Sequence, residues 1–239
     1  NMSKEYYLTE VVEIAYKNDL KIDLIHIDEQ EVLGVNSRKD LALAEKIIQT
    51  KLRHFFLNKG VTLIDPETNY FSYDTIIKKD VIIFPNVFIS EGVKIDSGSS
   101  IFSFCHLENC YIKKNVSIGP FARIRGNTVL NQNNKIGNFV ELKHVISEKD
   151  VKINHLSYIG DTSIGKSSNI GAGSITCNYD GHKKNKTFIG SNAFVGSNST
   201  MIAPLKIGDN STLGAGSVIT EDVNNGDLAI GRVRQINKK

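Results

Sequence analysis

The sequence predicts a mainly β protein: a left-handed parallel β-helix of hexapeptide repeats, preceded by a connecting α-helix and a short α/β segment. Between Ile189 and Ile219 an aliphatic residue or methionine returns at every sixth position, and glycine follows it in four of the five units. Neither the 3.6-residue period of an α-helix nor the alternation of a β-strand gives a strict six. A six-residue period is typical of a β-helix, in which three hexapeptides make one coil and the aliphatic side chain points inward.

The same period extends over much of the chain. It begins near Val81, slips by one residue near Tyr111 and is irregular between Val145 and Ile159. At about 18 residues per coil, the stretch from Val81 to Thr220 would supply roughly seven or eight coils. Coils that stack by backbone hydrogen bonds about 4.8 Å apart need few large side chains. The outer faces are therefore left free for function.

Residues 1–35 predict an incomplete α/β domain. Apolar side chains recur at helical spacing over residues 5–18, and residues 21–27 alternate like a strand. One helix and one strand cannot bury a sheet, because stability requires more strands or a packed face. We interpret this segment as the tail of an α/β domain whose main body is absent, with a small cap on the β-helix as the alternative.

Residues 36–60 predict a linker helix. Ser37 can cap its first turn, with an acidic residue three positions later, and Lys59-Gly60 ends it. Such a helix connects two domains or lies along the β-helix. Five apolar residues form one stripe that predicts packing rather than a ligand site: Leu41, Ala44, Ile48, Leu52 and Phe55.

The composition argues against several classes of function. A net charge of +3 over 239 residues gives no strong case for binding nucleic acid or a membrane surface. No apolar run approaches the ~20 residues that span a bilayer, and the first residues do not resemble a secretory signal. Cys105, Cys110 and Cys177 are odd in number and lack metal-ligand spacing. We expect reduced thiols in a cytoplasmic protein.

Two stretches depart from the repeat. Residues 176–186 contain no periodic aliphatic residue and include an Asp-Gly turn, so we expect an excursion from the coil. Its three lysines could meet a phosphate, and a solvated loop is the alternative. In the second stretch, residues 154–158, a histidine and a tyrosine interrupt a coil. By pattern alone, such a histidine is more often structural than catalytic.

Four motifs carry a family resemblance. They are Gly119–Arg125, Gly137–Lys143, His155–Asp161 and Asn169–Gly181. Together they resemble the bacterial bifunctional enzyme N-acetylglucosamine-1-phosphate uridylyltransferase / glucosamine-1-phosphate N-acetyltransferase. The resemblance covers essentially the whole chain, and the long motifs are specific to this family among hexapeptide proteins.

The resemblance also implies how the chain is divided. Residues 5–9 and 31–38 resemble the end of the family's nucleotidyltransferase domain, whose Gly-rich nucleotide loop is missing here. The expected parts are a remnant of that α/β domain at 1–35, the linker helix at 36–60, a left-handed β-helix acetyltransferase domain at 61–225 and a C-terminal tail at 226–239.

The activity that the resemblance implies is acetyl transfer from acetyl-CoA to the amine of glucosamine 1-phosphate. The product would serve UDP-N-acetylglucosamine, peptidoglycan and lipopolysaccharide synthesis. Uridylyltransferase activity, which needs Mg, is expected only in the full-length protein, because Asn36 matches one Mg ligand and cannot form that site alone. The family assembles as a homotrimer with sites shared between parallel β-helices, and no nucleic acid or membrane partner is implied.

Site residues follow from the resemblance by motif. His155 matches the general base, Asn178 a group that stabilises the developing oxyanion, and Glu141 a group that orients or polarises the His155 site. The expected sugar-phosphate ligands are Arg125, Lys143, Tyr158, Asn169 and Lys184, the last from a neighbouring subunit. The expected acetyl-CoA contacts are Ala172, Asn178, Tyr179, Ser197, Ala215 and Arg232.

Two positions depart from the family pattern. Gly126 and Arg234 stand where the family commonly has proline. The first is expected to loosen the placement of Arg125, and the second to alter the shape of the CoA end of the groove.

Two other readings of the β-helix stay open. One is a non-catalytic β-helix that only trimerises a sugar nucleotidyltransferase. The other is a zinc hydratase that uses His106, His144 and His155. These histidines are 38 and 11 residues apart, which does not return each to the same edge of successive ~18-residue coils.

Overall fold

The computed structural model describes residues 7–237 and divides into two compact units, Asn1–Ile47 and Ile48–Lys239. In the first unit the described elements are α1 (Glu10–Lys17), the 3₁₀ turn η1 (Glu29–Glu31) and the start of α2 (Arg38–Asn58). The helix expected over residues 5–18 is present as the shorter α1, and residues 5 and 6 lie outside the described residues.

The strand expected at residues 21–27 was a wrong prediction. Within residues 7–237 the first strand is β1 at Thr62, and residues 21–28 have no regular structure. Leu24 and Ile25 are exposed. A strand needs a hydrogen-bonded neighbour, and the described part of this unit supplies none.

The helix predicted over residues 36–60 is present as α2. Ser37 Oγ accepts a hydrogen bond from the Asp40 N–H at 3.1 Å. In return, Asp40 Oδ2 accepts one from the Asn36 N–H at 3.2 Å. This reciprocal cap satisfies two backbone donors at the helix start.

The packing face of α2 differs from the predicted stripe, because Leu41 and Phe55 are exposed. The buried residues are Gln49, Arg53 and Phe56. The first coil of the β-helix has no preceding coil to pair with, so long polar side chains of α2 bind its free backbone groups. Gln49 Nε2 donates to the carbonyl oxygen of Phe71 at 2.8 Å, and Gln49 Oε1 accepts from the Phe71 N–H at 2.9 Å. Arg53 adds hydrogen bonds to the main chain of the same coil.

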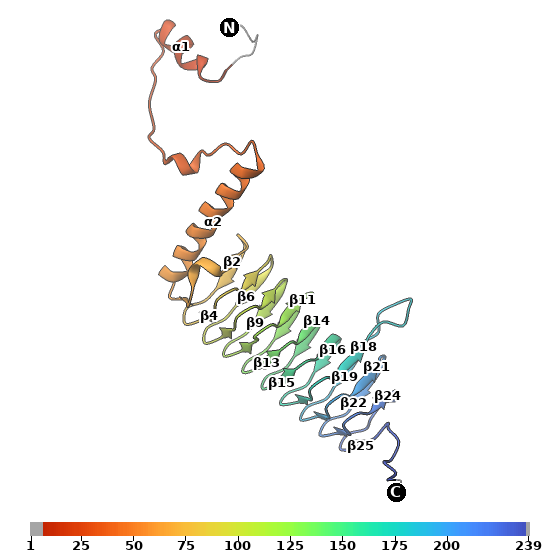
Figure 1. Ribbon diagram of the computed structural model, residues 1–239. Helices are drawn as coiled ribbons and strands as arrows, with labels where there is room; N and C mark the ends of the chain where they lie inside the picture. The colour runs from red at the N-terminus through yellow and green to blue at the C-terminus, as the bar shows by residue number, and fades with distance from the viewer. Residues whose placement is uncertain (1–6, 238–239) are drawn as a thin grey trace. The chain divides into compact units, whose positions relative to one another are not determined.

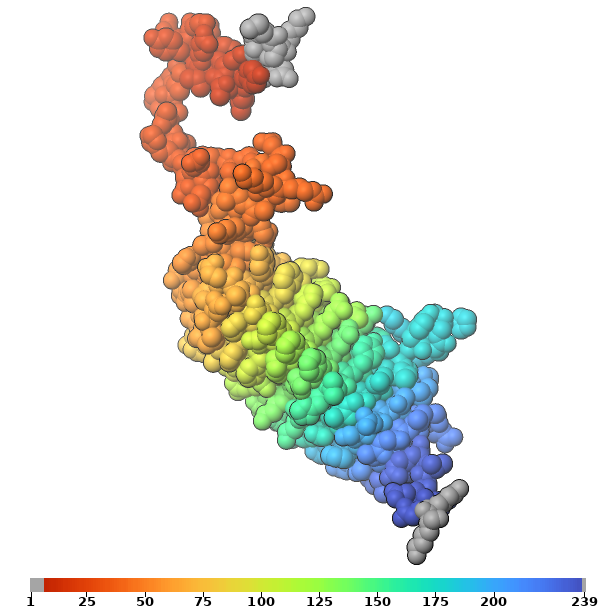
Figure 2. Space-filling view, in the orientation of Figure 1, coloured from red at the N-terminus to blue at the C-terminus, as the bar shows by residue number. Residues whose placement is uncertain are grey.

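The second unit is a parallel β-helix, which confirms the predicted fold class (Figure 1). One face is a ten-stranded sheet of β1 (Thr62–Leu63), β4 (Ile82–Ile83), β7 (Ser100–Ile101), β10 (Ser117–Ile118), β13 (Lys135–Asn138), β15 (Lys152–His155), β17 (Asn169–Ile170), β20 (Phe194–Val195), β23 (Thr212–Leu213) and β25 (Leu228–Ala229). The stacked coils and one projecting arm are visible in the space-filling view (Figure 2).

The other two faces belong to a fifteen-stranded sheet. Its strands are β2 (Tyr70–Phe71), β3 (Ile76–Ile77), β5 (Phe88–Ile89), β6 (Val93–Ile95), β8 (His106–Leu107), β9 (Cys110–Ile112), β11 (Arg123–Arg125), β12 (Thr128–Leu130), β14 (Glu141–Ser147), β16 (Tyr158–Ile164), β18 (Ile175–Cys177), β19 (Thr187–Ile189), β21 (Thr200–Ile202), β22 (Leu205–Ile207) and β24 (Val218–Ile219), and η2 (Pro66–Thr68) lies between β1 and β2. The two long strands β14 and β16 continue across the corner between the faces, which explains the irregular period there.

The repeat positions form the core. Ile101, Ile118, Ile136, Ile153, Ile170, Val195 and Leu213 pair in sequence along the ten-stranded sheet, and all are buried. Eight strands of that sheet fall between Val81 and Thr220, in agreement with the predicted seven or eight coils, and further strands precede and follow them. This architecture is consistent with the predicted left-handed coil. No helix within residues 7–237 is long and apolar enough to cross a membrane.

Candidate active site

One corner of the β-helix aligns His155 with a column of small residues. We call it the His155 corner, where the chain leaves the ten-stranded sheet. Its members lie two residues after the paired core positions of successive coils: Asn138, His155, Ala172, Ser197 and Ala215. The Asn198 N–H donates to the carbonyl of Ala172 at 2.7 Å, and the Gly216 N–H donates to the carbonyl of Ser197 at 2.8 Å, so the column is continuous.

The imidazole of His155 is exposed and held from one side. Its Nδ1 lies 2.8 Å from Asn138 Oδ1, one coil earlier. Because an amide oxygen only accepts hydrogen bonds, Nδ1 is the donor in this contact, and in the neutral imidazole the lone pair is then on Nε2. That is the protonation pattern of a general base.

Sequence reasoning missed Asn138. The residue lies 17 positions before His155, which is one coil, so the coil period alone could have found it. Glu141, which was expected to orient His155, instead accepts hydrogen bonds from Arg125 at 2.7 Å and lies 3.9 Å from Arg123. The residue that orients His155 is therefore Asn138.

Three cationic side chains gather beside β11 and β14. Arg125 and Lys143 are in register on these neighbouring strands, and Lys184 lies within hydrogen-bonding reach of Lys143. The pKa of Lys143 is lowered mainly by this contact with Lys184, with burial and the charges of Lys184 and Arg125 adding to the effect and Asp161 opposing it. Such a cluster is suited to a doubly charged phosphate.

Lys184 reaches this cluster on an arm that confirms the expected excursion (Figure 1). The arm leaves the coil between β18 and β19 as a small hairpin, in which Tyr179 and Lys184 form an antiparallel bridge. The Asn185 N–H donates to the carbonyl of Asn178 at 2.7 Å. The arm therefore places Lys184 beside Lys143 of the same chain, whereas the resemblance implied delivery from a neighbouring subunit.

The tip of the arm is ordered by Asp180. Its Oδ1 accepts hydrogen bonds from the N–H groups of His182 and Lys183 at 2.9 and 2.8 Å, and its Oδ2 accepts one from Asn185 at 2.8 Å. The backbone bonds from Lys183 and His182, with the bond from Asn185, lower the pKa of Asp180 to about 2.

Asn178 and Tyr158 meet over Gly160. A Cβ on Gly160 would lie 2.6 Å from the Tyr158 hydroxyl and 2.7 Å from Asn178 Nδ2, so the absence of a side chain lets both groups approach. Asn178 is buried, and its Nδ2 donates a hydrogen bond to Asp161. The sequence motif therefore brings a hydroxyl and an amide together over Gly160.

The remaining predicted residues lie further out. Asn169 lies on the ten-stranded sheet, in register with Lys152 of the strand that carries His155. Tyr179 is exposed at the base of the arm. Arg232 donates from Nε to the carbonyl of Ala215 at 2.8 Å, which places a cation at the end of the His155 corner.

The structure also shows the two positions that depart from the family pattern, and it tests the expected metal ligands. Gly126 has φ +70°, which proline cannot adopt, yet Arg125 keeps its bonds to Glu141. Arg234 lies in the exposed tail, and Asn36 is an exposed residue at the helix start. Residues 7–237 contain no group of three His, Cys, Asp or Glu side chains that could hold a metal.

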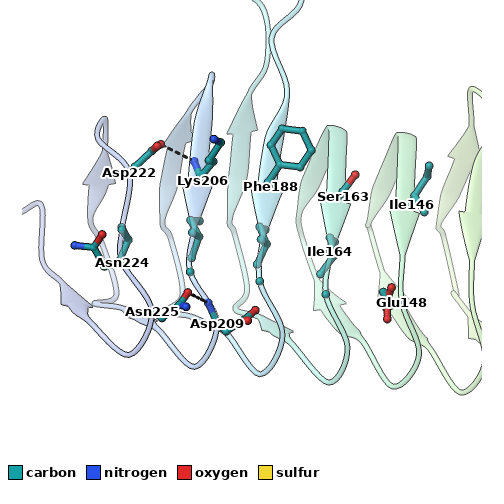
Figure 3. A pocket seen from close by; sticks show the side chains of 16 residues that line it. Ile146, Glu148, Ser163, Ile164, Phe188, Lys206, Asp209, Asp222, Asn224 and Asn225 are labelled. Carbon is teal, nitrogen blue, oxygen red and sulfur yellow. Dashed lines mark hydrogen bonds between the residues drawn. The ribbon is translucent and has the colours of Figure 1, made fainter.

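A large groove lies on another face and contains none of the predicted site residues (Figure 3). It has a volume of about 930 Å³ and is lined in part by Ile146, Phe188 and Lys206. Asp222 Oδ1 accepts a hydrogen bond from the Lys206 N–H at 2.8 Å. The Asp222 side chain satisfies a backbone donor of β22, the last strand of this face, so its role is structural.

Comparison with known proteins agrees with this fold. The family model "Bacterial transferase hexapeptide (six repeats)" matches residues 109–144, and "Hexapeptide repeat of succinyl-transferase" matches residues 186–221. Bifunctional protein GlmU of Wolbachia pipientis wMel is 52% identical over 235 residues, 98% of this chain and 55% of the relative. The GlmU of Paramagnetospirillum magneticum is 46% identical over 239 residues, 100% of this chain and 53% of the relative.

Among solved structures, an Arabidopsis UDP-N-acetylglucosamine acyltransferase covers 69% of this chain and 70% of its own, at 18% identity and a TM-score of 0.45. That likeness is too low to carry an argument about the site.

The fold and the repeats define a transferase-type hexapeptide β-helix. Within that class, the chain belongs with the bifunctional GlmU proteins. It spans about half the length of the curated relatives that it matches.

Proposed function

We propose that this chain transfers the acetyl group of acetyl-CoA to the amine of glucosamine 1-phosphate. The observation that carries the proposal is the His155 corner, where an imidazole with a free Nε2 stands in line with three small residues. A base at one end of a smooth column suits a reaction whose second substrate has a long, narrow arm. The similarity to GlmU over the whole chain supports the same assignment.

In the proposed reaction the substrate amine attacks the thioester carbonyl carbon. His155 Nε2 takes the proton that the amine loses, and the carbonyl electrons move to oxygen. When the tetrahedral intermediate collapses, the C–S bond breaks and the proton passes from His155 to the CoA thiolate. The products are the N-acetyl sugar phosphate and CoA, with no covalent enzyme intermediate.

The cationic cluster fits the phosphate of the sugar. Arg125 offers a planar fork of donors, while Lys143 and Lys184 act as point charges. A bound phosphate dianion would relieve the repulsion that lowers the pKa of Lys143. Tyr158 and Asn169 are the proposed sugar contacts.

The small residues of the His155 corner fit the pantetheine arm of acetyl-CoA. Three coil steps separate His155 from Ala215, about 14 Å at a strand spacing of 4.8 Å. Arg232 stands beyond Ala215, where its charge suits the nucleotide phosphates, and Tyr179 at the base of the arm suits the thioester end. Asn178 is placed to stabilise the oxyanion.

We further propose a homotrimer, because an exposed column of aromatic side chains is stabilised when another subunit buries it. Phe104, Phe121 and Phe139 stack with ring centroids 4.8 and 5.2 Å apart, and all three have positive φ, which is unusual for a bulky residue. Exposed apolar ladders of this kind mark interaction surfaces.

A cytoplasmic location fits the three free cysteines. Asn36 would contribute to Mg binding only alongside a complete uridylyltransferase domain.

The test is thiol release from acetyl-CoA in the presence of glucosamine 1-phosphate, for the native chain and a His155→Ala variant. His106→Ala is the matched control, because that imidazole is also held by one neighbouring polar group, Ser90 at 2.9 Å. Release by the native chain and the control, with loss in His155→Ala, is the expected result. A folded native chain that releases no thiol would favour a purely structural β-helix.

A further inference from the structure

A ladder of polar side chains connects the solvent to Asn178. It lies at the corner between the two faces of the fifteen-stranded sheet, which we call the Asn178 corner. Its members His144, Asp161 and Asn178 occupy equivalent positions of successive coils, and Gly126 occupies that position one coil earlier. His144 Nδ1 lies 3.1 Å from Asp161 Oδ1, and Asn178 Nδ2 donates to Asp161 Oδ2. Exposure falls along the ladder, from 43% for the His144 side chain to 15% for Asp161, and Asn178 is buried.

The carboxylate of Asp161 determines which atoms His144 and Asn178 must turn toward it. An ionised carboxylate only accepts hydrogen bonds. His144 must therefore donate from Nδ1, and Asn178 must turn its NH₂ group toward Asp161. Only one of the two N–H bonds of that group is needed there, so the second N–H and the amide oxygen remain for the candidate site.

The position of His144 depends on Gly126. A Cβ at Gly126 would lie 2.8 Å from His144 Cδ2 and 3.0 Å from Nε2, so a side chain there would displace the ring. His144 itself has φ 54°, an uncommon conformation for a residue with a side chain. The glycine that departs from the family pattern is thus matched to the histidine that begins the ladder.

We propose that His144 and Asp161 are positioning residues that hold the Asn178 carboxamide in the orientation needed at the acyl oxygen. The proposal rests on the acetyl transfer proposed above. Asp161 also faces Lys143, whose pKa it raises against the effect of Lys184 and Arg125. Among the described residues the His144 ring makes its hydrogen bond to Asp161, so substitutions of His144 test the ladder without removing Lys143, Lys184, Arg125 or Asp161 from the phosphate cluster.

The variants are His144→Ala, His144→Gln and Asp161→Asn. The matched control is Asp150→Asn, because Asp150 Oδ1 accepts a hydrogen bond from Asn133 Nδ2 at 2.9 Å across one coil step. Asp150 also has a positive φ, as Asp161 does, so the control removes the same carboxylate–carboxamide hydrogen bond at another corner of the coil, away from the site. Thiol release is measured over a range of acetyl-CoA concentrations, and side-chain NH₂ signals are followed by ¹⁵N NMR with Asn178→Ser as the assignment reference.

Loss of a positioning bond acts on the transition state more than on binding. We expect His144→Ala to lower kcat about tenfold, less than the hundredfold or more for removal of an oxyanion donor, with the KM for acetyl-CoA within about threefold. His144→Gln, which keeps a donor, recovers most of kcat, and Asp161→Asn loses at least as much as His144→Ala. The Asn178 NH₂ signals shift in His144→Ala and not in Asp150→Asn.

Two results would overturn the proposal. One is a folded His144→Ala variant with native kcat and unshifted Asn178 NH₂ signals. The other is an equal loss of kcat in Asp150→Asn, which would show a general effect on the coil. A native chain that releases no thiol refutes the acetyl transfer instead, and the positioning role at the acyl oxygen with it, while the NH₂ signals separately report whether the hydrogen-bonded ladder exists.

Discussion

His155 Nδ1 lies 2.8 Å from Oδ1 of Asn138, the residue directly beneath it in the preceding coil. The parallel register of β13 and β15 makes this pairing, because it places Asn138 and His155 opposite each other. One coil thus carries the proposed base, and the coil before it sets which nitrogen of that base is free.

Replacing Asn138 with alanine should slow the reaction without weakening substrate binding. Without Asn138 the imidazole can rotate and exchange tautomers, so fewer molecules present a free Nε2 to the amine. We expect kcat to fall about tenfold, comparable to the loss of one hydrogen bond to a reacting group, with little change in either KM. Steady-state thiol release measures this. Asn133→Ala removes another corner asparagine and should leave kcat unchanged; a similar loss there would contradict the assignment.

Replacing Lys184 with glutamine should stabilise the free protein and weaken phosphate binding. The pKa of Lys143 is lowered by Lys184, so the charged cluster is under repulsion when no anion is bound. A lysine whose folded pKa lies below its unfolded value disfavours folding at pH below the folded pKa, and this penalty is lost as pH rises from the folded pKa to the unfolded value of 10.5. The variant should therefore have a Tm at or above that of the native chain near neutral pH, with the difference vanishing at alkaline pH.

The same cluster predicts the pH dependence of phosphate binding. As pH rises through the lowered pKa of Lys143, one positive charge is lost, and the KM for glucosamine 1-phosphate should increase. In Lys184→Gln the KM should already be higher near neutrality and should begin its alkaline rise at higher pH. A KM that is independent of both Lys184 and pH would place the phosphate elsewhere.

Replacing Gly160 with alanine should disturb Tyr158 and Asn178 together. The added Cβ would lie 2.6 Å from the tyrosine hydroxyl and 2.7 Å from the amide nitrogen, closer than such atoms approach. Because both are terminal polar groups rather than backbone, the coil should survive while the two groups move apart. We expect a fall in kcat of at least tenfold, as for a displaced oxyanion donor, with circular dichroism unchanged. Native activity in a folded Gly160→Ala variant would show that neither group acts at the reacting atoms.

Asp180 should stabilise the arm above the acid range. Its pKa is lowered to about 2, first by the backbone N–H groups of Lys183 and His182. A carboxylate with a depressed folded pKa contributes stability that is present above its unfolded pKa, 3.8, and is lost as pH falls toward 2. Asp180→Ala should make the arm more sensitive to proteolysis at neutral pH and raise the KM for the sugar phosphate through Lys184. Equal proteolysis of variant and native chain would contradict this.

The repeat made the fold predictable, because a six-residue period has one common structural solution. The same regularity places His155, Ala172 and Ser197 in one column once the coil step is known. Asn138 and Asp161 were missed because their roles come from contacts between corner positions one coil apart, which the aliphatic period by itself does not show.

The errors lie where the repeat ends. The apolar stripe of α2 was expected to pack, yet Gln49 and Arg53 are buried because the first coil has free backbone groups that only polar side chains can satisfy. The alternation at residues 21–27 indicated a strand, but a strand forms only where a neighbour supplies hydrogen bonds. Both outcomes depend on the surroundings of a segment and not on its own pattern.

The aromatic ladder gives the sharpest test of the proposed trimer. Phe121 has φ 56° and lies in the same corner column as Asn86 and Asn198, which have φ 59° and 54°. Asparagine tolerates this conformation far better than phenylalanine, so Phe121→Asn should leave the coil intact or slightly more stable. It also removes the middle ring of the stack. We expect the variant to dissociate at concentrations where the native chain is trimeric, as measured by sedimentation velocity, with its circular dichroism unchanged. A variant that stays trimeric would show that the ladder lies outside the subunit interface.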